Sequence, residues 1–218
     1  VKGISTSHEG KPLFSNVSFT VNKGDKIAIT GSNSLAISKF FDILAGEEEP
    51  ESGEIKWGVT ITPAYLPNNN DEYFNGSMNL IDWLRQYSEN KDETYIRGFL
   101  FKMLFSGEET LKKSNVLSGG EKVRCMLSRM MLLEGNVLLF DEPTNHLDME
   151  TIIALNNAMK DFPGTIIFTS HDHELNNSVA NRIIEITPGG NLDKLMTYDE
   201  FVKSDVVKEQ RENMMASV

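Results

Sequence analysis

The sequence predicts an α/β fold in which a mixed or parallel sheet carries a β-rich N-terminal part and a helical subdomain. Residues 13–30 alternate apolar and polar side chains, a pattern typical of half-buried strands. Between about 78 and 111 the apolar residues recur at helical spacing instead. Further on, continuous apolar runs such as VLLF and TIIF alternate with helical segments. Such runs indicate parallel strands that helices cover on both faces.

The first third of the chain is expected to be rich in strands. The opening VKGIST reads as a strand already under way, so we expect a piece of a longer protein. Residues 13–21 and 26–30 read as strands joined by the turn Asn22-Lys23-Gly24-Asp25. Residues 54–66 form another alternating segment, which Pro63 and Pro67 punctuate.

The rest of the chain is expected to alternate helices with strands. The helical subdomain spans about 70–115. The periodicity then predicts helices at 118–134, 148–161 and 172–179, and strands at 137–141, 165–169 and 182–187. The segment 198–218 is charged and helical in propensity, and we expect it to be a solvated tail. We expect a single domain over residues 1–218.

Composition narrows the classes of protein that the chain could represent. Cys125 is the single cysteine, which excludes a disulfide scaffold and favours a reducing, cytoplasmic location. No apolar run is long enough for a membrane span. The net charge of -11, from 21 basic and 32 acidic residues, disfavours direct binding to DNA or RNA.

The strand predicted at 137–141 ends in two consecutive carboxylates followed by a proline. Ligands of α/β proteins bind at the carboxyl ends of strands. Asp141 is therefore a candidate Mg²⁺ ligand, and Glu142 could polarise an attacking water. Taken alone, the motif is equally compatible with a strand end that carries no chemistry.

A helix start with exposed amides precedes this strand. Ser118 and Glu121 have the spacing of a capping box, and Gly119 and Gly120 between them leave the first helical amides unshielded. Unshielded amides at a helix N-terminus attract anions. By itself, a plain capped helix is the simpler interpretation.

The segments LSGGE, LLFDEPTNHLD and FTSHD together resemble the ATP-binding-cassette (ABC) ATPases, in the family's order and spacing over residues 117–172. The form DEPTNHLD after LSGGEK is similar to the ABC-F proteins, which are soluble two-cassette translation factors. The ending RIIEITP followed by YDEF is similar to the second cassette of that family, so the likeness covers nearly the whole chain.

The resemblance implies a P-loop NTPase-like cassette that uses ATP and Mg²⁺. It makes Asp141 the Walker B carboxylate, Glu142 the catalytic base and His171 the switch histidine. The signature and the D-loop then comprise Leu117, Ser118, Gly119, Gly120 and Glu121, and Asn145, His146, Leu147 and Asp148.

The loop after residues 26–30 fits the phosphate-loop frame G-x-x-x-x-G-K-S/T over Gly31, Ser32, Asn33, Ser34, Leu35, Ala36, Ile37 and Ser38. Ser38 keeps the hydroxyl for Mg²⁺, but Ala36 replaces the second glycine and Ile37 the lysine. Lys39 lies about 200° further round the helix and is expected to point away. A lost charged hydrogen bond costs about 1.5–3 kcal/mol, so nucleotide binding at this loop is expected to be weak.

Two further positions depart from the family pattern. His8 stands where the family has an aromatic residue that stacks on adenine. Pro67, followed by Asn68, Asn69 and Asn70, stands where the family has a glutamine. A plain polar loop is at least as good an interpretation of these asparagines as a functional one.

The resemblance implies an ATP-binding and ATP-hydrolysing cassette that pairs around MgATP with a second cassette, either upstream in the same polypeptide or in a homodimer. The ribosome enters as a partner by resemblance alone. One alternative is a pseudo-ATPase that donates its signature to the partner's site, which Ile37 favours and which Glu142 and His171 oppose. Another is the ATP-binding subunit of a membrane transporter, which Pro67 disfavours.

Overall fold

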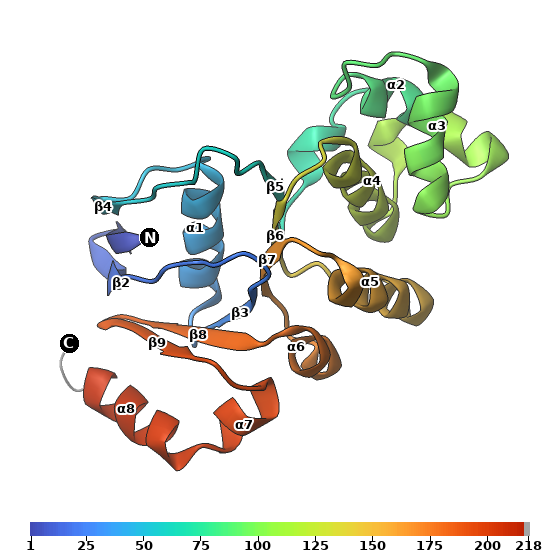
Figure 1. Cartoon of the computed structure of the whole chain (residues 1–218). Coiled ribbons are helices and arrows are strands. Elements are labelled where there is room, and N and C mark those ends of the chain that lie inside the picture. The colour runs from blue at the N-terminus through green and yellow to red at the C-terminus, as the bar shows by residue number, and fades with distance from the viewer. Residues whose placement is uncertain (216–218) are drawn as a thin grey trace.

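A six-stranded sheet forms the centre of the computed structural model, which describes residues 1–215 (Figure 1). Its strand order is β5-β6-β7-β3-β8-β9. The first five of these strands run parallel, and β9 is antiparallel to β8. Their bounds are β3 Lys26–Thr30, β5 Pro63–Leu66, β6 Val137–Asp141, β7 Thr165–Thr169, β8 Arg182–Thr187 and β9 Gly190–Lys194. The predicted α/β class with a mixed sheet is confirmed.

One face of this sheet packs on helix α1 (Ser34–Ala45), which a small antiparallel sheet covers in turn (Figure 1). That sheet has the order β2-β1-β4 and consists of β1 Lys2–His8, β2 Lys11–Val17 and β4 Ser52–Glu54. The core between the two sheets contains Phe40 and Phe41 of α1 and alternate residues of β3, Ile27 and Ile29. Because a strand alternates its faces, Ala28 belongs to the core on the opposite side.

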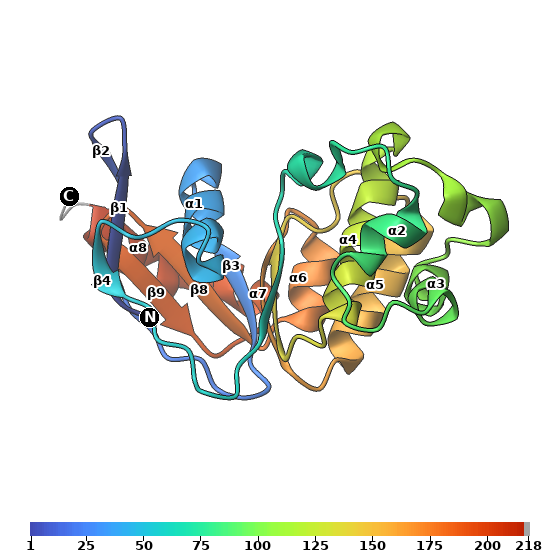
Figure 2. The same cartoon turned by 90° about the horizontal axis from the view of Figure 1, so that it is seen from above.

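The opposite face of the sheet carries α4 (Gly119–Leu132), α5 (Met149–Asp161) and α6 (His173–Val179) (Figure 1). The expected helical subdomain lies beyond α4 and includes α2 (Leu80–Arg85), α3 (Glu93–Lys102) and short 3-10 turns (Figure 2). Between residues 1 and 215, no helix has both the length and the apolar character of a membrane crossing.

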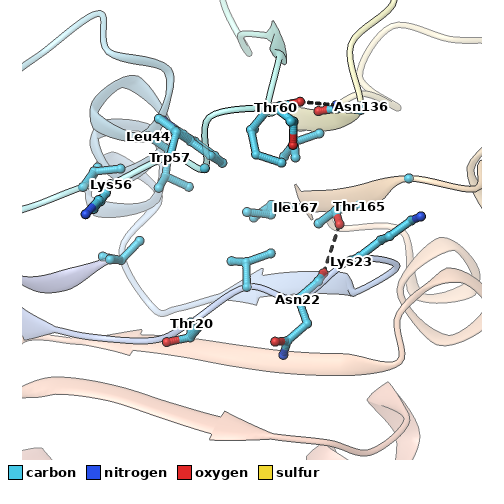
Figure 3. Close-up of a pocket in the computed structure, with 17 residues that line it drawn as sticks. Thr20, Asn22, Lys23, Leu44, Lys56, Trp57, Thr60, Asn136, Thr165 and Ile167 are labelled. Carbon is cyan, nitrogen blue, oxygen red and sulfur yellow. Dashed lines mark hydrogen bonds between the residues drawn. The ribbon is translucent and has the colours of Figure 1, made fainter.

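Of the alternating segment predicted at 54–66, only the two ends form strands. β4 ends at Glu54, and residues 55–62, which we name the strap, have no regular secondary structure before β5 begins at Pro63. The Asn136 side chain donates to the carbonyl of Thr60 and accepts from the amide of Thr62, so non-local bonds replace strand pairing (Figure 3). Apolar and polar residues alternate along the strap because Ile55, Trp57 and Ile61 pack on the core around α1.

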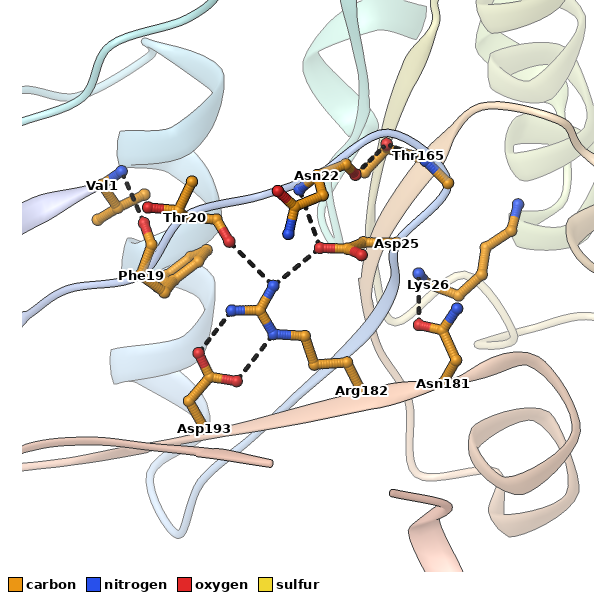
Figure 4. Close-up of polar contacts among 11 residues, drawn as sticks. Val1, Phe19, Thr20, Asn22, Asp25, Lys26, Thr165, Asn181, Arg182 and Asp193 are labelled. Atoms are coloured by element: carbon orange, nitrogen blue, oxygen red, sulfur yellow. Dashed lines mark hydrogen bonds and ion pairs between the residues drawn. The ribbon is translucent and has the colours of Figure 1, made fainter. Parts of the chain in front are cut away.

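The strand predicted at 13–21 also ends earlier than expected, because β2 ends at Val17 and not at residue 21. The loop that follows is bound by Arg182, whose side chain is 8% exposed at the start of β8. Its guanidinium donates to the carbonyl of Thr20 and to the carboxylates of Asp25 and Asp193, at 2.8–2.9 Å for three of these bonds (Figure 4). Two carboxylates thus compensate one buried cation and join the loop to β8 and β9.

The expected solvated tail instead packs on the sheet, apart from residues 216–218, which lie outside the described residues. Helices α7 (Tyr198–Lys203) and α8 (Asp205–Met215) lie below β8 and β9 in Figure 1. Phe201 and Val207 are buried, and the Arg211 guanidinium makes two hydrogen bonds of 2.6 and 2.8 Å to Glu185. Charged residues are frequent in both helices, so the sequence pattern does not reveal the few apolar residues that anchor them.

The two neighbouring valines of α8 provide a matched test of this packing. Val207 is 1% exposed and Val206 is 59% exposed. We expect Val207→Ala to lower the free energy of unfolding by about 1–3 kcal/mol through lost burial and the cavity it leaves. We expect Val206→Ala to change it by less than about 0.5 kcal/mol. Urea denaturation measures both, and equal effects would contradict the packed position of α8.

Candidate nucleotide and magnesium site

The predicted motifs meet at the carboxyl edge of the six-stranded sheet. β3, β6 and β7 are parallel neighbours, and Asp141 at the end of β6 is paired in register with Thr169 at the end of β7. The loop 31–38 follows β3, Glu142 follows β6, and His171 follows β7. Because parallel strands end at the same edge, residues distant in the sequence come together there.

Asp141 is 2% exposed and accepts a hydrogen bond of 2.8 Å from the hydroxyl of Ser38. Burial, together with the negative charges of Glu142 and Asp42, raises the pKa of Asp141 to about 6, although the Ser38 hydroxyl and the backbone N–H of Asn68 counteract the rise. The negative charge at this position is therefore only partly compensated, which favours a cation.

Ser38 and Asp141 supply the hard oxygen ligands that Mg²⁺ prefers. Across the described residues, no group of three or more His, Cys, Asp and Glu side chains could hold a metal ion by itself. Two protein oxygens leave most of an octahedral shell open for water and for oxygens of a ligand such as a phosphate. The residues present fit Mg²⁺ that arrives with a nucleotide.

Glu142 is held in an uncommon backbone conformation, with φ of 52°. Its amide donates to the carbonyl of Thr169 at 3.1 Å, and its carboxylate accepts from the amide of His171 at 3.2 Å. The His171 Nε2 lies 3.4 Å from the same carboxylate, while the imidazole is 87% exposed. A strained, hydrogen-bonded carboxylate beside an open imidazole is a common arrangement at functional sites.

The first half of the phosphate loop is exposed to solvent, and its second half is mostly buried. Residues 31–35 are exposed, and the Asn33 side chain caps α1 by accepting from the amides of Leu35 and Ala36 at 3.0 and 3.3 Å. Ile37, at the lysine position, is 6% exposed and packs in the core with Phe40. Its Cδ1 lies 3.0 Å from where a side chain on Gly31 would begin. Lys39 forms an ion pair with Glu48 and is not free to replace the lysine.

The signature glycines have a packing role that the sequence does not reveal. The expected capping box forms, since Ser118 and Glu121 exchange hydrogen bonds of 2.9 and 3.3 Å. A Cβ on Gly119 would lie 2.9 Å from His146 Cβ, and one on Gly120 would lie 2.8 Å from the His146 carbonyl. The start of α4 therefore requires glycines so that the D-loop turn can approach it.

The other residues of these motifs hold local structure. Leu117 is buried in the core, and Leu147 packs on the same core. Asp148 caps α5 by accepting from the amide of Thr151 at 2.8 Å. These contacts explain the turn between β6 and α5.

The asparagine loop after β5 contacts both halves of the site. The Asn145 side chain donates to Asn68 Oδ1 at 3.2 Å, and the backbone N–H of Asn68 donates to Asp141. Sequence reasoning missed Asp42, which lies one helical turn after Ser38 and accepts from the Tyr65 hydroxyl at 2.9 Å. The i, i+4 spacing from Ser38 is the signal that could have found it.

His8 stands apart from the other predicted residues. It is exposed at the end of β1, where it pairs with Lys11. Within residues 1–215, its ring forms no hydrogen bond, ion pair or ring contact. Its stacking role therefore rests on the resemblance alone.

Two cavities flank the carboxyl edge. One of about 800 Å³ contains Ser38 and Asp141, and one of about 280 Å³ contains Gly119, Glu142 and His146. Among the described residues, no part of the signature 117–121 lines the larger cavity. Ser38 and Gly119 thus line two neighbouring cavities, which share residues of the loop after β5 such as Asn68 and Asn69.

A family model described as "ABC transporter" matches residues 14–145. The chain is 57% identical over 215 residues to the "Uncharacterized ABC transporter ATP-binding protein YkpA" of Bacillus subtilis, covering 97% of this chain and 40% of that protein. It is 30% identical to "ABC transporter F family member 5" of Arabidopsis thaliana, over 94% of this chain and 30% of the relative. It is 34% identical to the "Energy-dependent translational throttle protein EttA" of Haemophilus influenzae, over 85% of this chain and 34% of the relative.

The chain thus spans less than half the length of these relatives. Among solved structures, the fold matches a dimeric ATP-binding cassette in a post-hydrolysis state bound to ADP and Pi. The TM-score is 0.70 at 17% identity, over 89% of this chain and 96% of that one.

Replacing Asp141 with Asn tests the buried charge, because the amide keeps an oxygen that can accept from Ser38. Without divalent cations, we expect Asp141→Asn to raise the free energy of unfolding at pH 8 by up to about 3 kcal/mol. In the fold Asp141 holds its proton up to about pH 6, above the ordinary carboxyl value of 3.8, so the gain must shrink as the pH falls below 6.

Urea denaturation at pH 5 and pH 8 measures this difference. Asp161→Asn, at an exposed carboxylate, is the matched control and is expected to change little. An equal effect of Asp141→Asn at both pH values would contradict the buried charge.

Proposed function

The chain belongs to the ABC transporter family as an ATP-binding cassette, and on this premise we propose that it binds MgATP and hydrolyses it at an interface with a second cassette. In this proposal residues 1–218 form one nucleotide-binding domain of a longer protein. The observation that carries the proposal is the hydrogen bond between Ser38 and Asp141, next to Glu142 and His171.

We propose a distinct task for each group. Ser38 and Asp141 would hold Mg²⁺, which would neutralise phosphate charge when bound with the nucleotide. Glu142 would accept a hydrogen bond from the attacking water and orient it, and the exposed imidazole of His171 would contact the γ-phosphate. Positioning and charge compensation provide most of the catalysis in phosphoryl transfer.

The exposed start of α4 supports pairing with another cassette. Ser118 and Gly119 are exposed at the start of α4, and this start does not line the cavity of Ser38 and Asp141. An anion held by the signature amides therefore belongs to a site that a second cassette completes. The dimeric cassette found among solved structures is compatible with this arrangement.

The replaced lysine limits affinity at the chain's own loop. Ile37 directs an apolar side chain into the core, and Lys39 is occupied by Glu48. The Ser38 hydroxyl remains, whereas the Asn33 side chain already accepts from the amides of Leu35 and Ala36, so we propose weak binding of MgATP. The alternative function is a pseudo-ATPase that donates its signature to the partner's site. Ile37 is the observation that favours this alternative.

A role in translation is the finer part of the proposal. It is supported by the resemblance to ABC-F proteins and by the relative that is named a translational throttle protein. We propose that the longer protein acts in the cytoplasm, with the ribosome as its partner. The transporter alternative has no observation in its favour beyond the family itself.

Ile37→Lys tests the degenerate loop. We expect the native chain to bind a fluorescent ATP analogue weakly in the presence of Mg²⁺, and Ile37→Lys to bind it about 10–100-fold more tightly, because a charged hydrogen bond to phosphate contributes about 1.5–3 kcal/mol. Ile37→Met has a similar volume without the charge and is expected to leave the affinity near that of the native chain. If both variants bind like the native chain, the missing lysine does not limit binding.

Glu142→Gln separates the enzyme from the signature donor. We expect it to lower the rate of ATP hydrolysis by about 10²-fold or more while the binding of ATP persists, because the amide cannot act as a base. Steady-state phosphate release measures the rate. Two results together would favour the signature donor. The native 218-residue chain would not hydrolyse ATP, and Ser118→Ala in the longer protein would lower ATP hydrolysis by that protein.

A further inference from the structure

A cavity of about 540 Å³ lies at the amino edge of the six-stranded sheet, opposite the edge that carries Asp141 (Figure 3). The buried residues Leu44 of α1, Val137 of β6 and Ile167 of β7 form its floor. Val137 begins β6, and Asp141 ends it, so a full strand separates the cavity from the proposed nucleotide site.

Apolar side chains of the strap form one wall of the cavity. Ile55, Trp57 and Ile61 line it, and Val21 lines it from the loop before β3. All four are partly buried and pack on the core around α1. The cavity is thus an open extension of that core, with an indole in its wall.

Hydrogen bonds of two side chains that line the cavity, Asn136 and Thr165, hold its walls. Asn136 bonds the strap at Thr60 and Thr62, at 2.8 and 2.9 Å. Thr165 donates to the carbonyl of Asn22 at 3.1 Å and accepts from the amide of Gly24 at 3.2 Å. These hydrogen bonds fix both walls, and apolar side chains form the larger part of the lining, as is common in small-molecule sites.

The charged side chains at the rim are all basic. No Asp or Glu is among the residues that line the cavity, although the chain carries 32 acidic and 21 basic residues. Lys23 and Lys56 lie at opposite ends of the rim and point outward in Figure 3, and within residues 1–215 neither forms an ion pair. They are placed to meet a charged group at the mouth and not one inside the cavity.

We propose that this cavity binds a small amphiphilic anion, namely an aromatic or aliphatic group with one carboxylate or sulfonate head. The hydrocarbon part packs between Trp57 and Ile167, and the head remains at the rim near Lys23 or Lys56. The volume lies within the range of about 300–1,000 Å³ typical of small-molecule sites. The site shares no residue with the proposed nucleotide site and does not depend on the proposed function.

Two fluorescent probes with the same aromatic framework test the proposal on the 218-residue chain. 8-Anilinonaphthalene-1-sulfonate carries the anionic head, and N-phenyl-1-naphthylamine lacks it. We expect both to bind and to quench indole emission. Trp83 is buried in the helical subdomain, so Trp57→Phe must remove most of the quenching. Quenching that persists in Trp57→Phe would overturn the location.

Substitutions at the rim separate the two parts of the site. We expect the double variant Lys23→Gln/Lys56→Gln to bind the sulfonate about 2–10-fold more weakly, since each exposed charge contributes about 0.2–1 kcal/mol, and to bind the neutral probe unchanged. The double variant Lys113→Gln/Lys160→Gln, at exposed lysines outside the cavity, is the matched control. Equal effects of the two double variants would overturn the role of the rim.

A filled cavity tests the interior. Ile61→Trp is expected to weaken both probes at least tenfold, with circular dichroism confirming the fold. Should this variant not fold, Val21→Phe fills the same space from the other wall. Undiminished binding of both probes in a folded filling variant would place them elsewhere and overturn the proposal.

Discussion

The buried carboxylate of Asp141 is the constraint on which the rest of the carboxyl edge depends. A carboxylate in this position requires hydrogen-bond donors or a cation, because burial without them penalises its charged form. The hydroxyl of Ser38 and the backbone N–H of Asn68 supply two donors, and each fixes a different segment. Ser38 sets the position of α1 against β6, and Asn68 holds the loop after β5 beside the D-loop through Asn145. The remaining negative charge, increased by Glu142 and Asp42, gives the edge its preference for a cation.

The short parallel strands give the molecule two different edges. β6 and β7 have five residues each and are buried on both faces, so their registers are fixed by two cores at once. The carboxyl edge collects Asp141, Glu142 and His171, whereas the amino edge collects the apolar cavity beneath the strap. Arg182 anchors the loop before β3 at this second edge and thereby holds one wall of the cavity.

The features that could be predicted are those that the sequence encodes locally. The strands at 137–141, 165–169 and 182–187 were expected at their observed bounds because each is short and rich in apolar residues, with a continuous apolar run in the first two. The strap was misread because a coil that faces the core can alternate like a strand. Helices α7 and α8 were misread because the buried residues Phe201 and Val207 are few among charged residues. At the site, motif spacing indicated Asp141 and Ser38, but the contacts of His146 with Gly119 and Gly120 and of Asn68 with Asn145 join distant segments. Such contacts leave no local pattern to recognise.

The side chain of Ile37 links the stability of the loop to the weak binding of MgATP that we propose. Burying an isoleucine contributes about 1.5–3 kcal/mol, a range similar to what a lysine would contribute to a bound phosphate. In this chain the position supports the core with Phe40 and Phe41, and Gly31 has room for it because glycine carries no side chain. The loop therefore keeps its shape without a ligand, and Asn33 satisfies the amides that a phosphate would otherwise occupy. Ser38, Asp141 and Glu142 keep their geometry beside this self-supported loop, so in the proposed function the missing charge affects the binding of MgATP more than the placement of the groups for hydrolysis.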